Sequence, residues 1–258
     1  MFTQSESYER FMGRWSRVLA KALLDFAKIE EGMSVLDVGC GTGAVSSEAG
    51  RRIGNGSVVG VDPSAEYIAG ARLSANCNCS FEVGDGQRLP FPSASFDAAI
   101  SMLALNFMPD ADAAAREMAR VTRPGGLVAA AVWDYGGGMQ MLRTFWDAVV
   151  EIDPQAEALD EKHLPLCSEG DLGRLFKEAG IAEVESRPIV IETRFASFED
   201  YWEPFGEGQG PAGAYLASLT LDQRRGLRDN IEDRLTTNSA GEIELTARAW
   251  TARGSIAS

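Results

Sequence analysis

The feature that most constrains this chain is a short apolar run that ends in alternating glycines. The run is Ser34–Val38, the turn after it is Gly39-Cys40-Gly41-Thr42-Gly43, and Ala44 begins a helical pattern. Glycines at such a turn permit positive φ angles and let the backbone approach a ligand at the helix N-terminus. The segment therefore predicts a strand, a ligand-binding turn and a helix, an arrangement that suits a nucleotide cofactor.

Strands and helices alternate along the chain after this turn. Runs that favour strands lie at 57–61, 80–83, 96–102 and 127–133, and helical patterns lie at 65–75 and 112–121. Such alternation predicts a parallel sheet with helices on both faces. In the final segment, apolar residues from Ile243 to Ala249 alternate with polar ones, which suits an antiparallel last strand.

Two segments interrupt the alternation, and we expect them to form a partly helical cap. We predict one domain over residues 1–258, with a Rossmann-like, seven-stranded, mostly parallel sheet whose last strand is antiparallel. An amphipathic pattern over about 8–28 predicts an N-terminal lid helix. The expected sheet core covers about 30–134, 169–193 and 242–254, and the expected cap insertions cover about 135–168 and 194–241.

The amino-acid composition excludes some classes of binding partner. The net charge of −14 and the absence of a basic cluster argue against nucleic acid and against anionic membrane surfaces. Apolar stretches such as Leu127–Trp133 are far shorter than the roughly 20 residues of a membrane span, and the polar N-terminus does not resemble an export signal. We therefore expect a cytoplasmic protein. Four cysteines and one histidine predict no metal site, and the pattern neither specifies nor excludes a homo-oligomer.

The glycines alone do not select the cofactor, but Asp37 helps to do so. Gly39, Gly41 and Ala44 also satisfy the pattern of dinucleotide-binding turns. A carboxylate at the end of the strand, beneath the turn, would repel a pyrophosphate and attract a ligand that carries an amino group or a sulfonium. Asp37 therefore favours a cationic cofactor over a dinucleotide.

Acidic residues also end the next two strands. Asp62, followed by Pro63 and Ser64, is placed to accept both hydroxyls of a ribose, although a helix cap is an alternative role. Asp85, followed by Gly86 and Gln87, is placed to accept from an adenine amine, although a plain turn is an alternative there.

Four segments, taken in order, carry a family resemblance. VLDVGCGTG, VVGVDPS, GDGQRLPFPSASFDAAIS and VTRPGGLVAA resemble the successive motifs of class I S-adenosylmethionine-dependent methyltransferases. The likeness runs from about Ser34 to Trp133 and is greatest to the small-molecule branch related to enzymes of ubiquinone and menaquinone biosynthesis. It implies S-adenosyl-L-methionine as cofactor and S-adenosyl-L-homocysteine as product.

The resemblance also implies roles for individual residues. Asp37 and the turn would hold the methionine part of the cofactor, Asp62 the ribose, and the segment after Asp85 the adenine. Ser101 would border the methionine end and the transfer site, and Tyr8, Met12 and Trp15 would belong to a lid. The cofactor-binding set expected is Asp37, Gly39, Cys40, Gly41, Thr42, Gly43, Asp62, Pro63, Ser64, Asp85, Gly86, Gln87, Ser101, Tyr8 and Trp15.

Methyl transfer from a sulfonium is an in-line displacement that depends first on alignment and exclusion of water. A general base is therefore not required for every acceptor. His163, Asn106 and Tyr135 are the candidates if one exists, and His163 is the residue whose ordinary pKa lies near neutrality. Many relatives carry a histidine in the segment after Ser101, where this chain has Leu105-Asn106-Phe107.

The cap should determine the acceptor. Phe198, Tyr201, Trp202 and Phe205 recur at helical spacing, so they form either the wall of an apolar or aromatic substrate site or the packing face of a cap helix. The candidate substrate residues are Trp133, Trp146, Tyr201, Trp202 and Phe205.

Taken together, the sequence predicts S-adenosylmethionine-dependent methyl transfer to a small, apolar or aromatic acceptor. Two alternatives remain open at this point. One is a nicotinamide-dependent oxidoreductase, which Asp37 and the GDGQRLPF segment disfavour. The other is a module that binds the cofactor without turnover, which the absence of an evident base favours.

Overall fold

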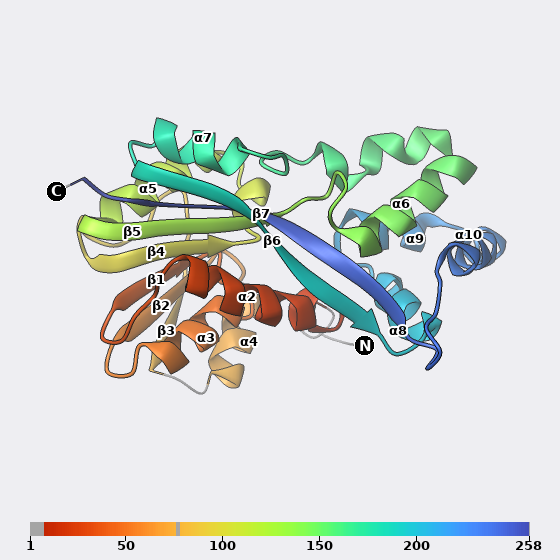
Figure 1. Ribbon diagram of the computed structural model, residues 1–258, viewed down its shortest axis with the longest axis horizontal. Coiled ribbons are helices and arrows are strands. Elements are labelled where there is room, and N and C mark those ends of the chain that lie inside the picture. The colour runs from red at the N-terminus through yellow and green to blue at the C-terminus, as the bar shows by residue number, and fades with distance from the viewer. Residues whose placement is uncertain (1–7, 76–77, 258) are drawn as a thin grey trace.

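The computed structural model describes residues 8–75 and 78–257. Its seven strands form one sheet in the order β3-β2-β1-β4-β5-β7-β6 (Figure 1). The strands are β1 Ser34–Val38, β2 Ser57–Asp62, β3 Cys79–Val83, β4 Phe96–Met102, β5 Thr122–Trp133, β6 Ala182–Phe195 and β7 Ile243–Ser255. Neighbouring strands from β3 to β5 are parallel, whereas β7 is antiparallel to both β5 and β6. The predicted sheet, including its antiparallel last strand, is confirmed.

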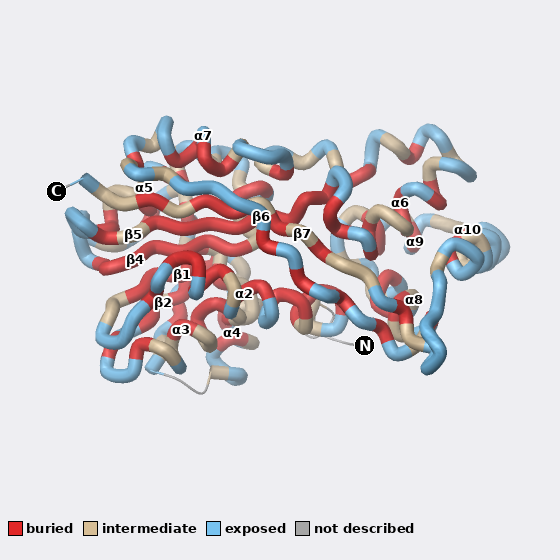
Figure 2. The backbone as a smooth tube through the Cα atoms, viewed as in Figure 1, coloured by how far each residue is buried: buried red, intermediate tan, exposed pale blue. Residues whose placement is uncertain are grey.

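Helices cover both sides of this sheet. In Figure 1, α2 (Arg14–Phe26), α3 (Ala44–Arg52) and α4 (Ala65–Ser74) lie below it, and α5 (Ala111–Val121) and α7 (Asp171–Glu178) lie above it. Every residue of β4 is buried, and the central strands are buried along most of their length (Figure 2). This burial explains why the strands are apolar runs without alternation, as parallel strands covered on both faces are.

The 3-10 helix η2 (Leu105–Phe107) follows β4, and the helices of the two insertions gather at one end of the molecule, beyond the sheet (Figure 1). We call them the cap. It consists of α6 (Gln140–Ile152), η3 (Pro154–Leu159), η4 (Glu161–His163), α8 (Phe198–Trp202), η5 (Glu203–Glu207), α9 (Gly210–Ser218) and α10 (Leu221–Arg234). The long strands β6 and β7 extend toward it, with Phe195 paired to Ile243 at their far end. Both predicted insertions therefore contribute helices to the same region.

The predicted N-terminal helix is present, although its first turns, η1 (Glu9–Gly13), form a π-helix that leads into α2. The Pro124-Gly125-Gly126 segment has the residues that are typical of a turn, but it is part of β5, with a register irregularity before Ala98. Gly125 N–H donates to Ile256 O, and Ile256 N–H donates to Gly126 O. The segment stays in the sheet because the chain beyond β7 pairs with it and because Gly125 adopts the positive φ of 76° that this irregularity requires.

Within the described ranges, no helix has both the length and the apolar character of a membrane span.

Candidate active site

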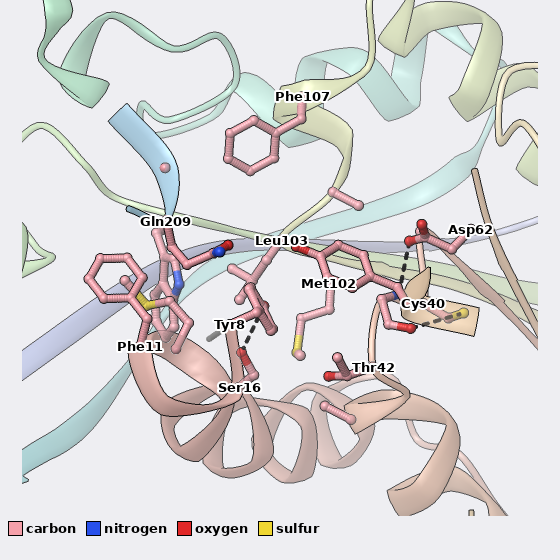
Figure 3. A pocket seen from close by; sticks show the side chains of 18 of the residues that line it. Tyr8, Phe11, Ser16, Cys40, Thr42, Asp62, Met102, Leu103, Phe107 and Gln209 are labelled. Atoms are coloured by element: carbon pink, nitrogen blue, oxygen red, sulfur yellow. Dashed lines mark hydrogen bonds between the residues drawn. The ribbon is translucent and has the colours of Figure 1, made fainter. Parts of the chain in front are cut away.

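A cavity of about 390 Å³ lies where β1, β2, β4 and β5 end, between the glycine turn and the cap (Figure 3). In Figure 3, Cys40 and Asp62 stand on one side of it, and Phe11 and Gln209 stand on the other. Its lining includes Tyr8, Asp37, Gly39, Cys40, Gly41, Thr42, Asp62, Pro63, Trp133 and Tyr135 from the predicted set. Strand ends and the cap therefore share a single space.

The glycine turn is shaped for close approach of a ligand. Gly39 and Gly41 have φ values of 72° and 51°, which only glycine adopts without strain. A Cβ on Gly39 would collide with the side chain of Ala104. A Cβ on Gly41 would meet no atom within 4 Å and would project into open space at the edge of the cavity. The turn thus keeps room that a side chain would otherwise fill.

Asp62 organises this turn. Its Oδ2 accepts a hydrogen bond from Gly41 N–H at 2.9 Å, and its Oδ1 accepts one from Ser64 N–H at 2.9 Å. Burial raises the pKa of Asp62, and these two bonds oppose that effect. The cap of α4 is Ser64, whose Oγ accepts from Tyr67 N–H, so the alternative role foreseen for Asp62 belongs to its neighbour.

Asp37 lies deeper, at 1% exposure. Its Oδ2 accepts from both the N–H (2.9 Å) and the hydroxyl (2.6 Å) of Ser46, on the helix that follows the turn. Burial raises the pKa of Asp37 to about 7, although the two bonds from Ser46 lower it in part. The carboxyl group is thus held beneath the turn, at the position predicted from the sequence.

The N-terminal segment closes one side of the cavity. Tyr8, Phe11, Met12 and Ser16 line it, and the Tyr8 hydroxyl lies 3.2 Å from Ser16 Oγ. Glu9 accepts a hydrogen bond from the Thr42 hydroxyl, which ties this segment directly to the glycine turn.

Trp15, another predicted lid residue, does not line the cavity. Its ring packs edge-on against Phe195 of β6, with centroids 5.3 Å apart. Trp15 is therefore part of the hydrophobic core and not of a lid over the cavity.

The loop after β3 lies beside the cavity without lining it. Asp85 is exposed, and its Oδ1 accepts from both Gln87 N–H and Gln87 Nε2, which lowers the pKa of Asp85. Gln87 Oε1 accepts from Asp110 N–H, which begins α5. A Cβ on Gly86 would lie 3.0 Å from Met108 Cε, and Met108 lines the cavity. The assignment of this loop to adenine stays a prediction.

Several buried polar atoms near the strand ends lack partners among the described residues. They are Ser101 Oγ, both amide atoms of Asn106 and Trp133 Nε1. Trp133 lines the cavity, whereas Ser101 and Asn106 are next in sequence to lining residues without lining it themselves. Buried polar groups normally have hydrogen-bond partners, so these atoms mark a region whose hydrogen-bonding groups are not all paired within the protein.

The cap contributes a second wall, formed by Tyr135, Leu142, Glu161 and Gln209–Pro211. Glu161 is 4% exposed, and it accepts hydrogen bonds from Trp146 Nε1 and, at 3.4 Å, from Ala212 N–H. Burial raises the pKa of Glu161 to about 7. Sequence reasoning missed this residue because it lies in an irregular acidic segment with no periodic pattern.

The aromatic residues of the cap form a layer behind this wall. Phe205 stacks on Phe145 with centroids 4.6 Å apart, and Phe11 of the cavity lining packs edge-on against Phe205. Tyr201 is fully buried, and its hydroxyl donates to Met141 O at 2.8 Å. Four of the candidate substrate residues are outside the cavity lining: Trp146, Tyr201, Trp202 and Phe205. This arrangement favours the packing alternative for the stripe.

His163 lies away from the cavity. Its side chain is 52% exposed, and its Nε2 lies 3.1 Å from Glu157 Oε1. Tyr135 does line the cavity, and burial raises its pKa well above the ordinary value. No cluster of three or more potential metal ligands occurs in residues 8–75 and 78–257.

Comparisons with known proteins agree with this geometry. A family model described as a methyltransferase domain matches residues 35–126. Nocamycin O-methyltransferase of Saccharothrix syringae is 30% identical over 200 residues, which cover 71% of this chain and 71% of that enzyme. The 2-methyl-6-phytyl-1,4-hydroquinone methyltransferase of a Synechocystis strain is 29% identical over 69% of this chain, which spans 56% of that relative's length.

A solved structure shares the fold over nearly the whole chain. Phosphoethanolamine N-methyltransferase 2 of Haemonchus contortus, solved with phosphomonomethylethanolamine and S-adenosylhomocysteine, aligns with a TM-score of 0.60 at 18% identity. The alignment covers 97% of this chain and 56% of that one. From the motifs, the fold and these relatives together, the chain belongs to the class I S-adenosylmethionine-dependent methyltransferases.

Proposed function

We propose that this enzyme methylates a small, apolar or aromatic acceptor that lies between the glycine turn and the cap. The observation that carries the proposal is one cavity that Asp37, Asp62 and Trp133 line from the sheet side and that Leu142 and Glu161 line from the cap side. One space with both walls allows cofactor and acceptor to meet out of contact with bulk water.

The residues of the turn fit S-adenosylmethionine. The open space at Gly41 accommodates close contact with the backbone, and Asp37 supplies a carboxyl group for the cationic methionine end. Asp62 would hold the ribose, the loop from Asp85 would border the adenine, and Ser101 would border the transfer site. When bound, the cofactor supplies a methyl group that its sulfonium activates for displacement.

The chain itself then contributes alignment and exclusion of water. Tyr8, Phe11 and Met12 close the N-terminal side, and Glu9 fixes that segment to Thr42. Alignment of reacting groups in a dry site supplies a large share of the acceleration for an in-line displacement. His163 has no part in this proposal because it lies outside the cavity.

The names of two relatives support this acceptor class. One relative is a nocamycin O-methyltransferase, and another is named for a hydroquinone that carries a phytyl group. The apolar side chains that line the cavity, among them Phe11, Met102, Leu103 and Leu142, suit such molecules. We further propose that residues 1–258 act as one catalytic unit in the cytoplasm, with the cap insertions selecting the acceptor.

Calorimetric titration with S-adenosylmethionine, S-adenosylhomocysteine and NADH, followed by a methylation screen of phenols, quinols and amines, tests the proposal. We expect both sulfur compounds to bind, NADH not to bind, and at least one aromatic acceptor to be methylated. Binding of NADH alone would favour the oxidoreductase alternative. Binding of the sulfur compounds without methylation of any acceptor would favour the module without turnover.

A further inference from the structure

We propose that Glu161 is the catalytic base of this enzyme, and that the acceptor carries a weakly acidic hydroxyl group, as in a phenol, a quinol or an enol. This inference rests on the proposed function and assigns the side of the cavity on which the acceptor's reacting atom lies.

The position of Glu161 carries the first step of the argument. It lines the cavity from η4 of the cap, whereas Asp37 and Asp62 line it from the ends of β1 and β2. In-line transfer places the nucleophile on the side of the methyl group that is remote from the sulfur. A carboxylate on the cap wall therefore faces the acceptor when the cofactor occupies the turn.

The other ionisable groups of the cavity are unsuited to this task. Asp37 and Asp62 line the cavity at the ends of β1 and β2, beside the turn that the cofactor would occupy, so they face the cofactor and not the acceptor. Burial raises the pKa values of the remaining groups, so they keep their protons at neutral pH: Tyr8, Cys40, Tyr67 and Tyr135. Glu161 is the cap-side group that can accept a proton.

Glu161 is buried with no cation beside it among the described residues, and this burial raises its pKa to about 7, so the group can both hold and release a proton near neutral pH. Trp146 and Ala212 each donate a hydrogen bond to it, and both bonds favour its charged form. In the described part of the chain, Glu161 forms no ion pair, because the nearby charged and titratable groups have other partners. Arg143 of α6 pairs with Asp160 and Asp147, Lys162 pairs with Glu157 and Asp160, and Tyr215 of α9 bonds to Asp153.

This charge favours a hydroxyl acceptor over an amine. A buried carboxylate beside an amine would stabilise the protonated amine, which has no lone pair for attack. Beside a hydroxyl, the same carboxylate removes the proton as the bond to carbon forms. The acceptor O–H bond breaks and its proton moves to Glu161, the oxygen electron pair forms the O–CH₃ bond, and the pair of the breaking S–CH₃ bond stays on sulfur.

The test uses Glu161→Gln and two phenols of different acidity. 4-Nitrophenol is largely ionised near neutral pH and needs no base, whereas 4-methylphenol is not ionised and needs one. We expect the variant to lose about 10²- to 10⁴-fold in kcat/KM with 4-methylphenol and less than about tenfold with 4-nitrophenol. Calorimetry should show an unchanged affinity for S-adenosylhomocysteine. The wild-type rate with 4-methylphenol should rise with pH and level off just above neutrality, whereas the rate of the variant should go on rising toward the pKa of the phenol itself.

Glu157→Gln is the matched control, because it makes the same chemical change at a partly exposed position of the same insertion, outside the cavity lining. It should leave kcat/KM with both phenols, and its dependence on pH, unchanged. The proposal is overturned if Glu161→Gln keeps the wild-type kcat/KM with both phenols. It is also overturned if kcat/KM falls by the same factor with both. Methylation of amines alone by the wild type overturns the acceptor class while leaving the proposed function intact, and failure to bind S-adenosylhomocysteine would refute the proposed function itself.

Trp146→Phe gives a second test that does not remove the carboxyl group. The change deletes the N–H that stabilises the charged form, so the pKa of Glu161 should rise and the pH–rate profile with 4-methylphenol should move to higher pH. Calorimetric affinity for S-adenosylhomocysteine and the melting temperature check that the fold persists. An unshifted profile in a folded variant contradicts the assignment.

Discussion

Asp62 at the end of β2 holds the glycine turn in place, because its Oδ2 accepts a hydrogen bond from Gly41 N–H at 2.9 Å. The same carboxylate accepts from Ser64 N–H, ahead of α4. A single side chain therefore joins two strand ends at the cavity, and cofactor binding and local stability depend on it together.

Replacement of Asp62 by alanine should damage both properties. We expect the affinity for S-adenosylmethionine to fall at least about tenfold, and the free energy of unfolding without cofactor to fall by about 1–2 kcal/mol because two part-buried N–H groups lose their acceptor. Calorimetry and urea denaturation measure the two effects. Asp112→Ala, at an exposed position of α5, serves as the control and should change neither quantity. Undiminished affinity in Asp62→Ala would refute the ribose assignment.

Gly39→Ala should be more harmful than the same change at another glycine of positive φ. Gly32 has a φ of 84° and nothing within 4 Å of an added Cβ, so Gly32→Ala should cost only the left-handed strain of about 1–2 kcal/mol. At Gly39 the added methyl also meets Ala104 at the cavity edge. We expect thermal unfolding to show a larger loss for Gly39→Ala, together with weakened cofactor binding that Gly32→Ala leaves intact. Equal effects on binding would mean that the turn does not contact the cofactor.

The free protein should become less stable as the pH rises through neutrality. The pKa values of Asp37 and Glu161 are raised to about 7 in the folded state, so the native protein binds more protons than the unfolded chain between about pH 4.5 and 7. Their stabilising contribution is complete below the unfolded pKa values and is lost as the pH passes about 7. In that window, each group should lower the free energy of unfolding by up to about 1.4 kcal/mol for each unit that the pH rises.

Urea denaturation from pH 5 to pH 8 measures this dependence. Glu161→Gln should reduce the wild-type slope, whereas Glu157→Gln should leave it unchanged in this range, because Lys162 lowers the pKa of the partly exposed Glu157. A Glu161→Gln variant with the full wild-type slope would contradict the raised pKa of Glu161.

The sheet could be predicted because its signals are local and redundant. β1, the glycine turn and α3 follow from a short motif, and β4 follows from an apolar run that is buried over its whole length. The merging of Pro124–Gly126 into β5 could not be predicted, because it depends on pairing with Ile256 at the other end of the chain. Local turn residues predict a turn only where no distant strand satisfies their backbone groups.

The cavity wall contributed by the cap was harder to foresee than the turn. Asp37 and Asp62 end strands whose neighbours fix their position, so sequence spacing alone predicted where they lie. Glu161 reaches the cavity through packing of η4 against Trp146 and Ala212, which are 15 and 51 residues away in sequence. No periodic pattern encodes such a contact.

The aromatic stripe of the cap provides the last prediction, since its residues differ in burial. Phe205 is fully buried and stacked on Phe145, whereas Trp202 is partly exposed. If the stripe serves packing, Phe205→Ala should lower the free energy of unfolding by about 3–5 kcal/mol and Trp202→Ala by clearly less. Denaturation curves and the KM for 4-methylphenol distinguish the two interpretations. A Phe205→Ala variant that keeps its stability but loses acceptor binding would show instead that Phe205 contacts the substrate, which would require the cap to open around it.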